Sequence, residues 1–292
     1  MSITISAELV KELRERTGAG MMECKKALVA AMGNIDDAIE AMRKAGQAKA
    51  DKKAGNIAAE GVTTVLINEE GKGVILEVNC QTDFVANDNS FKAFTAMVAE
   101  QALAKQTDDL NTIAAIEING TTIENTRQEL IAKIGENVQI RRAKFLQTEG
   151  IIGAYIHGGR ISVLIELQGG DKELAKDIAM HIAASNPLFI SPSEVSTDLI
   201  EKEREIFEAQ ANTSGKPKEI IEKMVEGRIK KFLDEISLLG QPFVKDPSIT
   251  IGNLLKKSNA TVTSFIRFGL GEGIEKKVTN FAEEVMAQVK GS

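Results

Sequence analysis

The sequence is poor in the residues that build metal centres and base-stacking surfaces. Its 292 residues include two cysteines, two histidines, one tyrosine and no tryptophan. Cys24 and Cys80 stand far from any Cys-x-x-Cys spacing, so we expect no metal site and no cofactor. One tyrosine and no tryptophan leave few rings on which nucleic-acid bases could stack. These scarcities weigh against a zinc protein and against a protein that binds nucleic acid.

Long apolar runs and an excess of positive charge are also missing. No run of 18 apolar residues occurs, and residues 1–6 lack the basic and apolar regions of a secretory signal. The formal net charge is −6, whereas non-specific nucleic-acid binding depends on neutralising phosphates. Two unpaired cysteines fit a reducing compartment. We therefore expect a cytoplasmic protein with no direct contact to membranes or nucleic acids.

The sequence patterns of common enzymes are absent too. The stretch Thr-Gly-Ala-Gly at 17–20 has neither the lysine nor the preceding strand of a phosphate-binding loop. His157 and His181 have no local catalytic pattern, and most carboxylates lie near lysines in helices, as on ordinary surfaces. We predict a binding protein and not an enzyme. The rival hypothesis is an enzyme that uses Cys80 or His157.

What is present is a globular composition, with 43% hydrophobic and 27% charged residues over a length typical of about two domains. The first part, 1–46, is predicted to be a small three-helix module. Ser6 and Asn34 can cap its first and third helices, and glycines 18, 20, 33 and 46 mark helix ends. The expected inner faces are Leu9, Val10 and Leu13; Met21, Cys24, Leu28 and Met32; and Ile35, Ala38, Ile39 and Met42.

Residues 47–60 lack a clear apolar stripe and are predicted to be a linker. We expect it to be helical at first and to break at Gly55. Lys49, Lys52 and Lys53 form a small basic cluster on it, which is expected to be solvated.

From residue 61 the pattern changes to strands. A hairpin is expected at 62–67 and 73–78, then helices at 90–105 and about 122–134, and a strand at 138–145. The series recurs with strands at 150–157 and 160–167, a helix at 173–184 and a strand at 262–268. Val-Ile-Leu-Glu-Val at 74–78 parallels Val-Leu-Ile-Glu-Leu at 163–167. We therefore predict an α+β fold with two duplicated α+β subdomains, 61–145 and 146–292.

The second subdomain contains an insertion and a C-terminal helix. Asp198 can cap a helix to about Ala211, and Pro217 is placed just inside the next helix, which carries apolar residues at helical spacing. An antiparallel helical hairpin at 198–238 follows from this pattern. It either folds back on its own body or packs against another copy of the chain.

The connection between the strand at 73–78 and the helix at 90–105 holds a bulky apolar residue, Phe84, directly after Asp83. Residues 87–90, Asn-Asp-Asn-Ser, offer several helix N-caps. Phe84 is either tucked under its own fold or offered to a partner. Physical chemistry alone favours the tucked alternative, because single exposed apolar residues usually carry no function.

Two long strings bear a family resemblance. Glu-Val-Asn-Cys-Gln-Thr-Asp-Phe-Val-Ala at 77–86, and Val-Lys-Glu-Leu-Arg-Glu-Arg-Thr-Gly-Ala-Gly-Met-Met-Glu-Cys-Lys-Lys-Ala-Leu at 10–28, resemble the translation elongation factor Ts family. The resemblance runs over essentially the whole chain. It implies a ubiquitin-associated-like fold for the N-terminal module. It also implies a guanine nucleotide exchange factor that binds the GTPase elongation factor Tu and expels GDP.

The resemblance also implies which residues meet the partner. Thr82, Asp83, Phe84 and Val85 would disturb the Mg²⁺ and phosphate site of the GTPase, with Phe84 exposed in the free protein. Further contacts would come from Arg14, Met21, Met22, Lys25, Ile134, Gly135, His157 and Val244. Next to Val244 this chain has Lys245, where the family has an apolar residue.

Two points stay open at this stage. Adjacent helix positions point about 100° apart, so Met21 and Met22 cannot both face one core, and we expect one to be exposed. The alternative function is a ubiquitin-associated-type scaffold or adaptor without exchange activity. The resemblance favours a homodimer through the helical hairpin over a hairpin that folds back.

Overall fold

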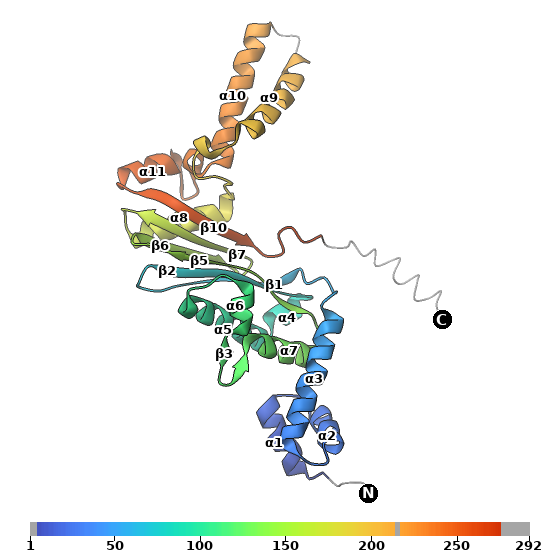
Figure 1. Ribbon diagram of the computed structural model, residues 1–292. Helices are drawn as coiled ribbons and strands as arrows, with labels where there is room; N and C mark the ends of the chain where they lie inside the picture. The colour runs from blue at the N-terminus through green and yellow to red at the C-terminus, as the bar shows by residue number, and fades with distance from the viewer. Residues whose placement is uncertain (1–4, 214–216, 276–292) are drawn as a thin grey trace.

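Two three-stranded antiparallel sheets form the centre of the molecule (Figure 1). The computed structural model describes residues 5–213 and 217–275 of the chain. One sheet has the order β1-β2-β5, with β1 Glu60–Ile67, β2 Lys72–Cys80 and β5 Val138–Gln147. The other has the order β10-β7-β6, with β6 Ile151–His157, β7 Ile161–Gln168 and β10 Thr261–Gly269. The mixture of helices and sheets confirms the α+β class, and all six predicted strands are present.

The two sheets pack face to face through a shared apolar layer. Val65, Ile75, Ile152, Leu164 and Phe268 are all buried in it. Gly73 makes this approach close, because a Cβ at that position would lie 2.6 Å from Ile152 Cδ1 and 2.8 Å from Leu164 Cδ1. Beside the layer, the Ser162 hydroxyl donates to Thr63 Oγ1 over 2.9 Å, and both residues are buried.

Helices cover the outer face of each sheet. The first sheet carries α5 Asn89–Lys105, α6 Leu110–Ala115 and α7 Ile123–Ile134, and the second carries α8 Lys172–Ser185 and α11 Ile251–Lys257. The helices predicted at 90–105, 122–134 and 173–184 are confirmed within two residues. Several short elements were not predicted. They are the helices α4 Asp83–Asn87, α6 and α11, the hairpin of β3 Glu117–Ile118 with β4 Thr121–Thr122, and the hairpin of β8 Pro242–Phe243 with β9 Asp246–Thr250. Elements this short hold too few residues to show a periodicity.

The N-terminal helices are α1 Ala7–Thr17, α2 Met21–Ala30 and α3 Ile35–Lys53. The predicted caps are confirmed: Ser6 accepts from the Leu9 N–H, and Asn34 accepts from the N–H groups of residues 36 and 37. The predicted helix end at Gly46 is wrong. Gly46 lies buried inside α3 and faces α7, where a Cβ would make an ordinary contact of 3.7 Å with Ala132 Cβ. A single glycine is tolerated inside a helix that packs on a neighbour. The helix ends at Lys53, close to the break expected at Gly55.

The predicted inner face of α2 is partly wrong. Cys24 and Leu28 are fully buried, but Met21 is 55% exposed and Met32 is 75% exposed. Met22 is 66% exposed, so both neighbouring methionines face outward and not only one. The core between α1, α2 and α3 is small, and two residues from α2 are enough to fill it.

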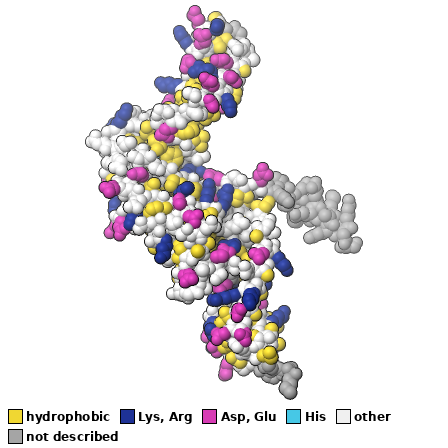
Figure 2. Space-filling model, viewed as in Figure 1, with side chains coloured by type: hydrophobic (Ala, Val, Ile, Leu, Met, Phe, Trp, Pro, Cys, Tyr) yellow, Lys and Arg dark blue, Asp and Glu magenta, His cyan; other side chains and the backbone are white. Residues whose placement is uncertain are grey.

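The inserted helices α9 Thr197–Asn212 and α10 Lys218–Ile236 pair and project from the second sheet (Figure 1). They have a small core of their own around Ala211, Val225 and Ile229. Acidic and basic side chains mix along their surface (Figure 2). Ser196, and not Asp198, caps α9, since its hydroxyl accepts from the Leu199 N–H. Pro217 precedes α10 and is not inside it.

Two predictions fall outside the described residues, namely the turn between α9 and α10 at 214–216 and the C-terminal helix within 276–292. Short 3₁₀ turns at Pro192–Glu194 and Leu238–Gly240 complete the second half. In the ranges 5–213 and 217–275, none of the helices combines the length and apolarity that a membrane crossing requires.

Candidate partner-binding site

Strand register places two distant segments side by side at one end of the first sheet. Cys80, the last residue of β2, pairs with Val138, the first residue of β5. Residues 81–85, which follow β2, therefore lie beside residues 134–137, which precede β5. Each segment contains residues of the predicted contact set, and the structure brings them together although Thr82 and Glu136 are 54 positions apart in the chain.

Four polar residues join these segments. The N–H and hydroxyl of Thr82 donate to the two carboxylate oxygens of Glu136 over 3.0 and 2.7 Å. Next to them, the Asn137 N–H donates to Gln81 Oε1 over 2.8 Å. The Asn137 side chain also donates to the carbonyl of Asn56 over 2.8 Å, which ties in the segment that follows α3. Sequence reasoning missed Gln81, Glu136 and Asn137, because only the fold reveals which polar residues meet.

The short helix α4 presents Phe84 to solvent. Thr82 is its N-cap and accepts weakly from the Val85 N–H over 3.4 Å. Phe84 is 85% exposed, the most exposed of the large apolar side chains among the described residues. The prediction of an exposed Phe84 is confirmed, and the tucked alternative is wrong. Asp83 is exposed beside it.

Val85 differs from its neighbours in the predicted set. Its side chain is 8% exposed and belongs to the core cluster under α5, together with Ala86. Val85 and Ala86 fix one side of α4 to the core, whereas Phe84 on the other side has no such packing. The direction in which the Phe84 side chain leaves the chain is thus set by the backbone of α4.

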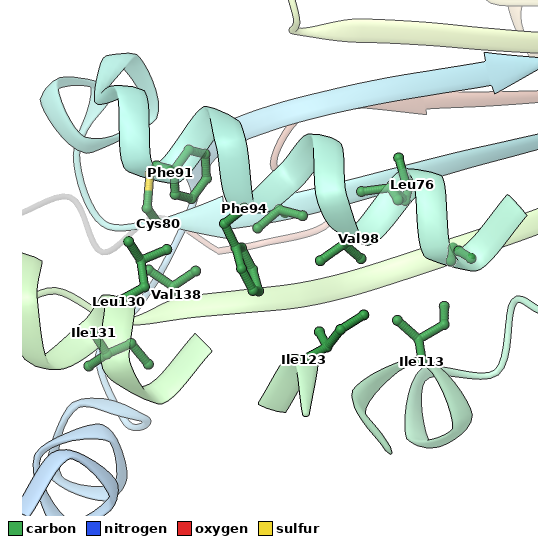
Figure 3. Close-up of a cluster of buried hydrophobic side chains, with 14 of the residues drawn as sticks. Leu76, Cys80, Phe91, Phe94, Val98, Ile113, Ile123, Leu130, Ile131 and Val138 are labelled. Atoms are coloured by element: carbon green, nitrogen blue, oxygen red, sulfur yellow. The ribbon is translucent and has the colours of Figure 1, made fainter. Parts of the chain in front are cut away.

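Cys80 lies directly under this connection, near Phe91 and Val138 (Figure 3). Burial and, to a smaller degree, the negative charge of Glu136 together raise the pKa of its thiol to about 12. The thiol donates to the Thr82 carbonyl over 3.2 Å. A buried thiol with a raised pKa is a poor nucleophile, so the hypothesis of a catalytic Cys80 loses its chemical basis.

The other predicted contacts at this end are exposed or half-buried. Gly135 ends α7 in the left-handed conformation, with φ +84°, and Ile134 packs partly against the core. His157 ends β6, is exposed and lies 3.3 Å from the Tyr155 hydroxyl. The turn after it reaches the same end of the sheets, because Arg160 Nη2 lies 3.4 Å from a carboxylate oxygen of Glu60, which pairs with Cys80.

The remaining predicted contacts lie elsewhere. Arg14, Met21, Met22 and Lys25 are exposed on α1 and α2. Val244 is 45% exposed next to β8. Its neighbour Lys245 makes an ion pair with Asp177 over 2.5 Å. The predicted residues thus occupy three surfaces.

The buried carboxylate of Glu77 links neighbouring segments close to the same end of the first sheet. Glu77 is fully buried and accepts from Arg141 over 3.0 Å, Arg142 over 2.6 Å, Asn79 over 2.9 Å and the Gly271 N–H over 2.8 Å. Burial acts to raise its pKa, but the hydrogen bonds from Gly271, Asn79 and Arg142 more than offset this and lower the pKa. Glu77 is therefore an ionised anchor that joins β2, β5 and the segment after β10.

Comparison with known proteins places this architecture in a family. The sequence model of the family described as Elongation factor TS matches residues 81–272. Elongation factor Ts of Thioalkalivibrio sulfidiphilus is 58% identical over 293 residues, which cover 99% of this chain and 100% of that protein. Those of Legionella pneumophila (strain Paris) and Francisella tularensis subsp. novicida are 58% and 57% identical, each over 98% of this chain and 99% of the relative. The chain belongs to the elongation factor Ts family, whose members act in protein biosynthesis as guanine nucleotide exchange factors.

Proposed function

We propose that this chain binds elongation factor Tu in the cytoplasm and accelerates the release of GDP from it. The observation that carries the proposal is the exposure of Phe84, 85% of whose side chain faces solvent on a short helix with a buried opposite side. A large apolar ring held outward on a fixed backbone is suited to insertion into a pocket of a partner. Membership of the elongation factor Ts family identifies the partner as this GTPase.

The proposed mechanism is selective binding of the nucleotide-free GTPase. A partner can expel GDP only if it stabilises the nucleotide-free form more than the bound form. Burial of one phenylalanine is worth roughly 1.5–3 kcal/mol, which corresponds to roughly a ten- to hundredfold bias. A pocket for Phe84 that opens only when the nucleotide site is distorted provides this bias.

Asp83 acts beside Phe84 in this proposal. A GTPase holds GDP through its phosphate loop and through Mg²⁺, which bridges phosphate oxygens and side-chain ligands. The exposed carboxylate of Asp83 brings negative charge next to that site and competes for the hydrogen-bond partners of the Mg²⁺ ligands. Thr82 and Val85 complete the segment, Thr82 as the cap of α4 and Val85 as its buried anchor.

The other predicted residues are proposed to dock the partner. Ile134 and Gly135 lie beside the Phe84 segment, and the turn after His157 reaches the same end of the sheets. The second surface consists of Arg14, Met21, Met22 and Lys25, and methionine suits adaptable contacts. Val244 is proposed as a third contact, with the ion-paired Lys245 beside it.

We also propose that the two sheets are copies of one ancestral unit. Each has a hairpin whose second strand is central and a later strand that pairs with it. In each, the register of the closing strand shifts at the same place. β5 shifts opposite the step from Glu77 to Val78, and β10 shifts opposite the step from their counterparts Glu166 to Leu167.

The proposed division is a ubiquitin-associated-like module at 1–46, a connection at 47–60 and subdomains at 61–145 and 146–292. The helical hairpin at 198–238 would serve self-association as a homodimer, and no contact with nucleic acid or membrane is proposed.

The test is the release of a fluorescent GDP analogue from elongation factor Tu, with and without this protein. We expect the release rate to rise with the concentration of the protein and to saturate. Serum albumin at equal concentration is the control for non-specific effects. A stable complex that forms without any acceleration of release would support the scaffold alternative and contradict the proposal.

A further inference from the structure

The orientation of Phe84 depends on a residue outside the proposed contact set. Phe84 is 85% exposed, so packing does not fix its ring, and the backbone of α4 alone sets where its Cβ lies and in which direction the side chain leaves the chain. On the side of Val85 and Ala86 the core fixes that backbone. At the start of α4, the carboxylate of Glu136 receives both donors of Thr82, at 3.0 and 2.7 Å. We propose that Glu136 is a positioning residue for nucleotide exchange, which holds Thr82 and thereby α4 in the geometry that presents Phe84.

The hydrogen-bond directions give Glu136 this role. An ionised carboxylate only accepts, so the Thr82 hydroxyl must direct its proton to Glu136. Its lone pairs are then free to face the Val85 N–H, 3.4 Å away, which is the capping contact of α4. Without Glu136 the hydroxyl can rotate, and the Thr82 N–H loses its partner. An N-cap interaction of this kind stabilises the first turn of a helix.

The neighbouring contacts reinforce the same orientation. The Cys80 thiol donates to the Thr82 carbonyl over 3.2 Å, so the N–H, hydroxyl and carbonyl of Thr82 are all held. Asn137, next to Glu136, donates its N–H to Gln81, next to Thr82. Since 136–137 follow Ile134 and Gly135 directly, the proposed contacts on both segments form one unit. Contact at Ile134 and Gly135 therefore fixes where Phe84 meets the partner.

The test is a double-mutant cycle on the maximal GDP release rate from elongation factor Tu, and it rests on the proposed function. We expect Glu136→Ala to slow maximal release about fivefold, the equivalent of one N-cap interaction. Half-saturation should stay within about twofold, because the docking surfaces are intact. In the Phe84→Ala background the same substitution should change the rate by less than about 1.5-fold, since no ring remains to be positioned.

Matched variants separate positioning from general damage. Thr82→Val lacks the hydroxyl and should resemble Glu136→Ala, whereas Glu136→Gln keeps a side-chain oxygen that can accept from Thr82 and should slow release less than Glu136→Ala does. Glu117→Ala removes the same charge from the exposed strand β3 and should have no effect. In the free protein, Glu136→Ala should speed amide hydrogen exchange in α4 and leave α5 unchanged. If Glu136→Ala fails to melt cooperatively, the comparison of Glu136→Gln with Thr82→Val decides.

The outcomes distinguish the two proposals. Wild-type release by Phe84→Ala would overturn the proposed function, and with it the reason to position the ring. Slow release by Phe84→Ala combined with wild-type release by Glu136→Ala would overturn the positioning role alone. The positioning role would also be overturned by a fivefold loss that persists in the Phe84→Ala background, because Glu136 would then act without Phe84.

Discussion

Glu77 in β2 and Glu166 in β7 occupy matching places in the two sheets, yet their surroundings differ. Glu77 is fully buried, with two arginines, an asparagine and a backbone N–H around it. Glu166 is only half-buried and accepts from the Thr148 hydroxyl over 2.5 Å and from Gln168 over 3.3 Å. The strand opposite makes the difference, since β5 places Arg142 across from Glu77 and β10 places Ser264 across from Glu166. The same strand pattern thus gives a buried ionic anchor in one sheet and a half-buried, hydrogen-bonded glutamate in the other.

The connections after these strands differ in the same way. After β2 comes the short helix α4 with its exposed Phe84, and then α5. After β7 the chain passes through Gly169 and Gly170 directly to Asp171, which caps α8. The first sheet therefore carries the segment with the exposed Phe84, which is the proposed partner-binding segment, and the second carries the inserted hairpin. The two halves thus share a sheet frame and differ in their connections, and the proposed binding residues lie mainly in such a connection, as is usual for functional residues.

The largest effect is expected when two phenylalanines of the first subdomain, Phe91 and Phe84, are compared. Phe91→Ala should lower the free energy of unfolding by about 3–5 kcal/mol, because Phe91 is fully buried. Phe84→Ala should change it by less than about 0.5 kcal/mol, as for an ordinary surface substitution, but should slow maximal GDP release roughly ten- to hundredfold. Urea unfolding and release kinetics of both variants provide the test. A large loss of stability with unchanged release in Phe84→Ala would mean that Phe84 is a core residue.

The next effect contrasts the two glutamates. Glu77→Ala should cost about 3 kcal/mol of unfolding free energy, the lower end for a broken buried ion pair, because water still reaches its arginine partners. The side chains of Arg141 and Arg142 are 24% and 30% exposed. Glu166→Ala should cost about 1 kcal/mol, as for one hydrogen bond. Equal losses in the two variants, measured by urea unfolding, would remove the distinction between the sheets.

A smaller effect is expected in the pH dependence of the unfolding free energy, through His181 in the second subdomain. His181 is fully buried in α8; its Nδ1 accepts from the Val244 N–H over 3.2 Å, so its Nε2–H donates to Gln241 over 2.9 Å. Burial lowers the pKa of His181, although the hydrogen bond to Gln241 acts in the opposite direction. The folded protein therefore resists protonation, while the unfolded chain takes up a proton below its pKa of about 6.5. The contribution of His181 to the free energy of unfolding is therefore complete above a pH of about 6.5 and falls as the pH drops below this value.

His181→Gln provides the measurement. Unfolding free energies of the wild type and the variant, compared between about pH 7.5 and 5, should show a decline in the wild type that the variant lacks. Glu77, whose lowered pKa makes its contribution fade only below the ordinary carboxyl value of 4.5, does not interfere in this range. Parallel pH profiles in the two proteins would contradict the assignment of a buried neutral histidine.

The smallest effect is expected from removing the insertion. Replacing residues 198–233 by a short turn should leave the one-to-one complex with elongation factor Tu and the release rate unchanged, and should alter only self-association. The reason is that α9 and α10 have their own core, and Arg204 pairs with Glu226 within the hairpin over 2.5 Å. Residues 234–236 must be kept, since Leu188 donates to the Ile236 carbonyl over 2.8 Å. Loss of exchange in a folded, monomeric variant would show that the hairpin contacts the GTPase.

Local patterns in the sequence determined much of this protein. Strand alternation, helical spacing and capping residues such as Ser6 and Asn34 act over a few residues, and so the long elements and their ends could be predicted. The pattern also identified the polar connection with Phe84, and the family resemblance favoured its exposure. Short elements such as α4 and α6 were missed, since their few residues show no periodicity, and Gly46 was misjudged because an isolated glycine can lie inside a helix that packs on a neighbour, as α3 packs on α7.

Only the tertiary structure decided which distant residues meet. The pairing of Cys80 with Val138 brings Glu136 to Thr82, and the pairing of Glu77 with Arg142 forms the buried anchor. The exposure of both Met21 and Met22 likewise depends on how many residues the small core between three helices can hold. Sequence patterns record the preferences of neighbouring residues, whereas such contacts depend on strand register and on the space left by side chains from elsewhere in the chain.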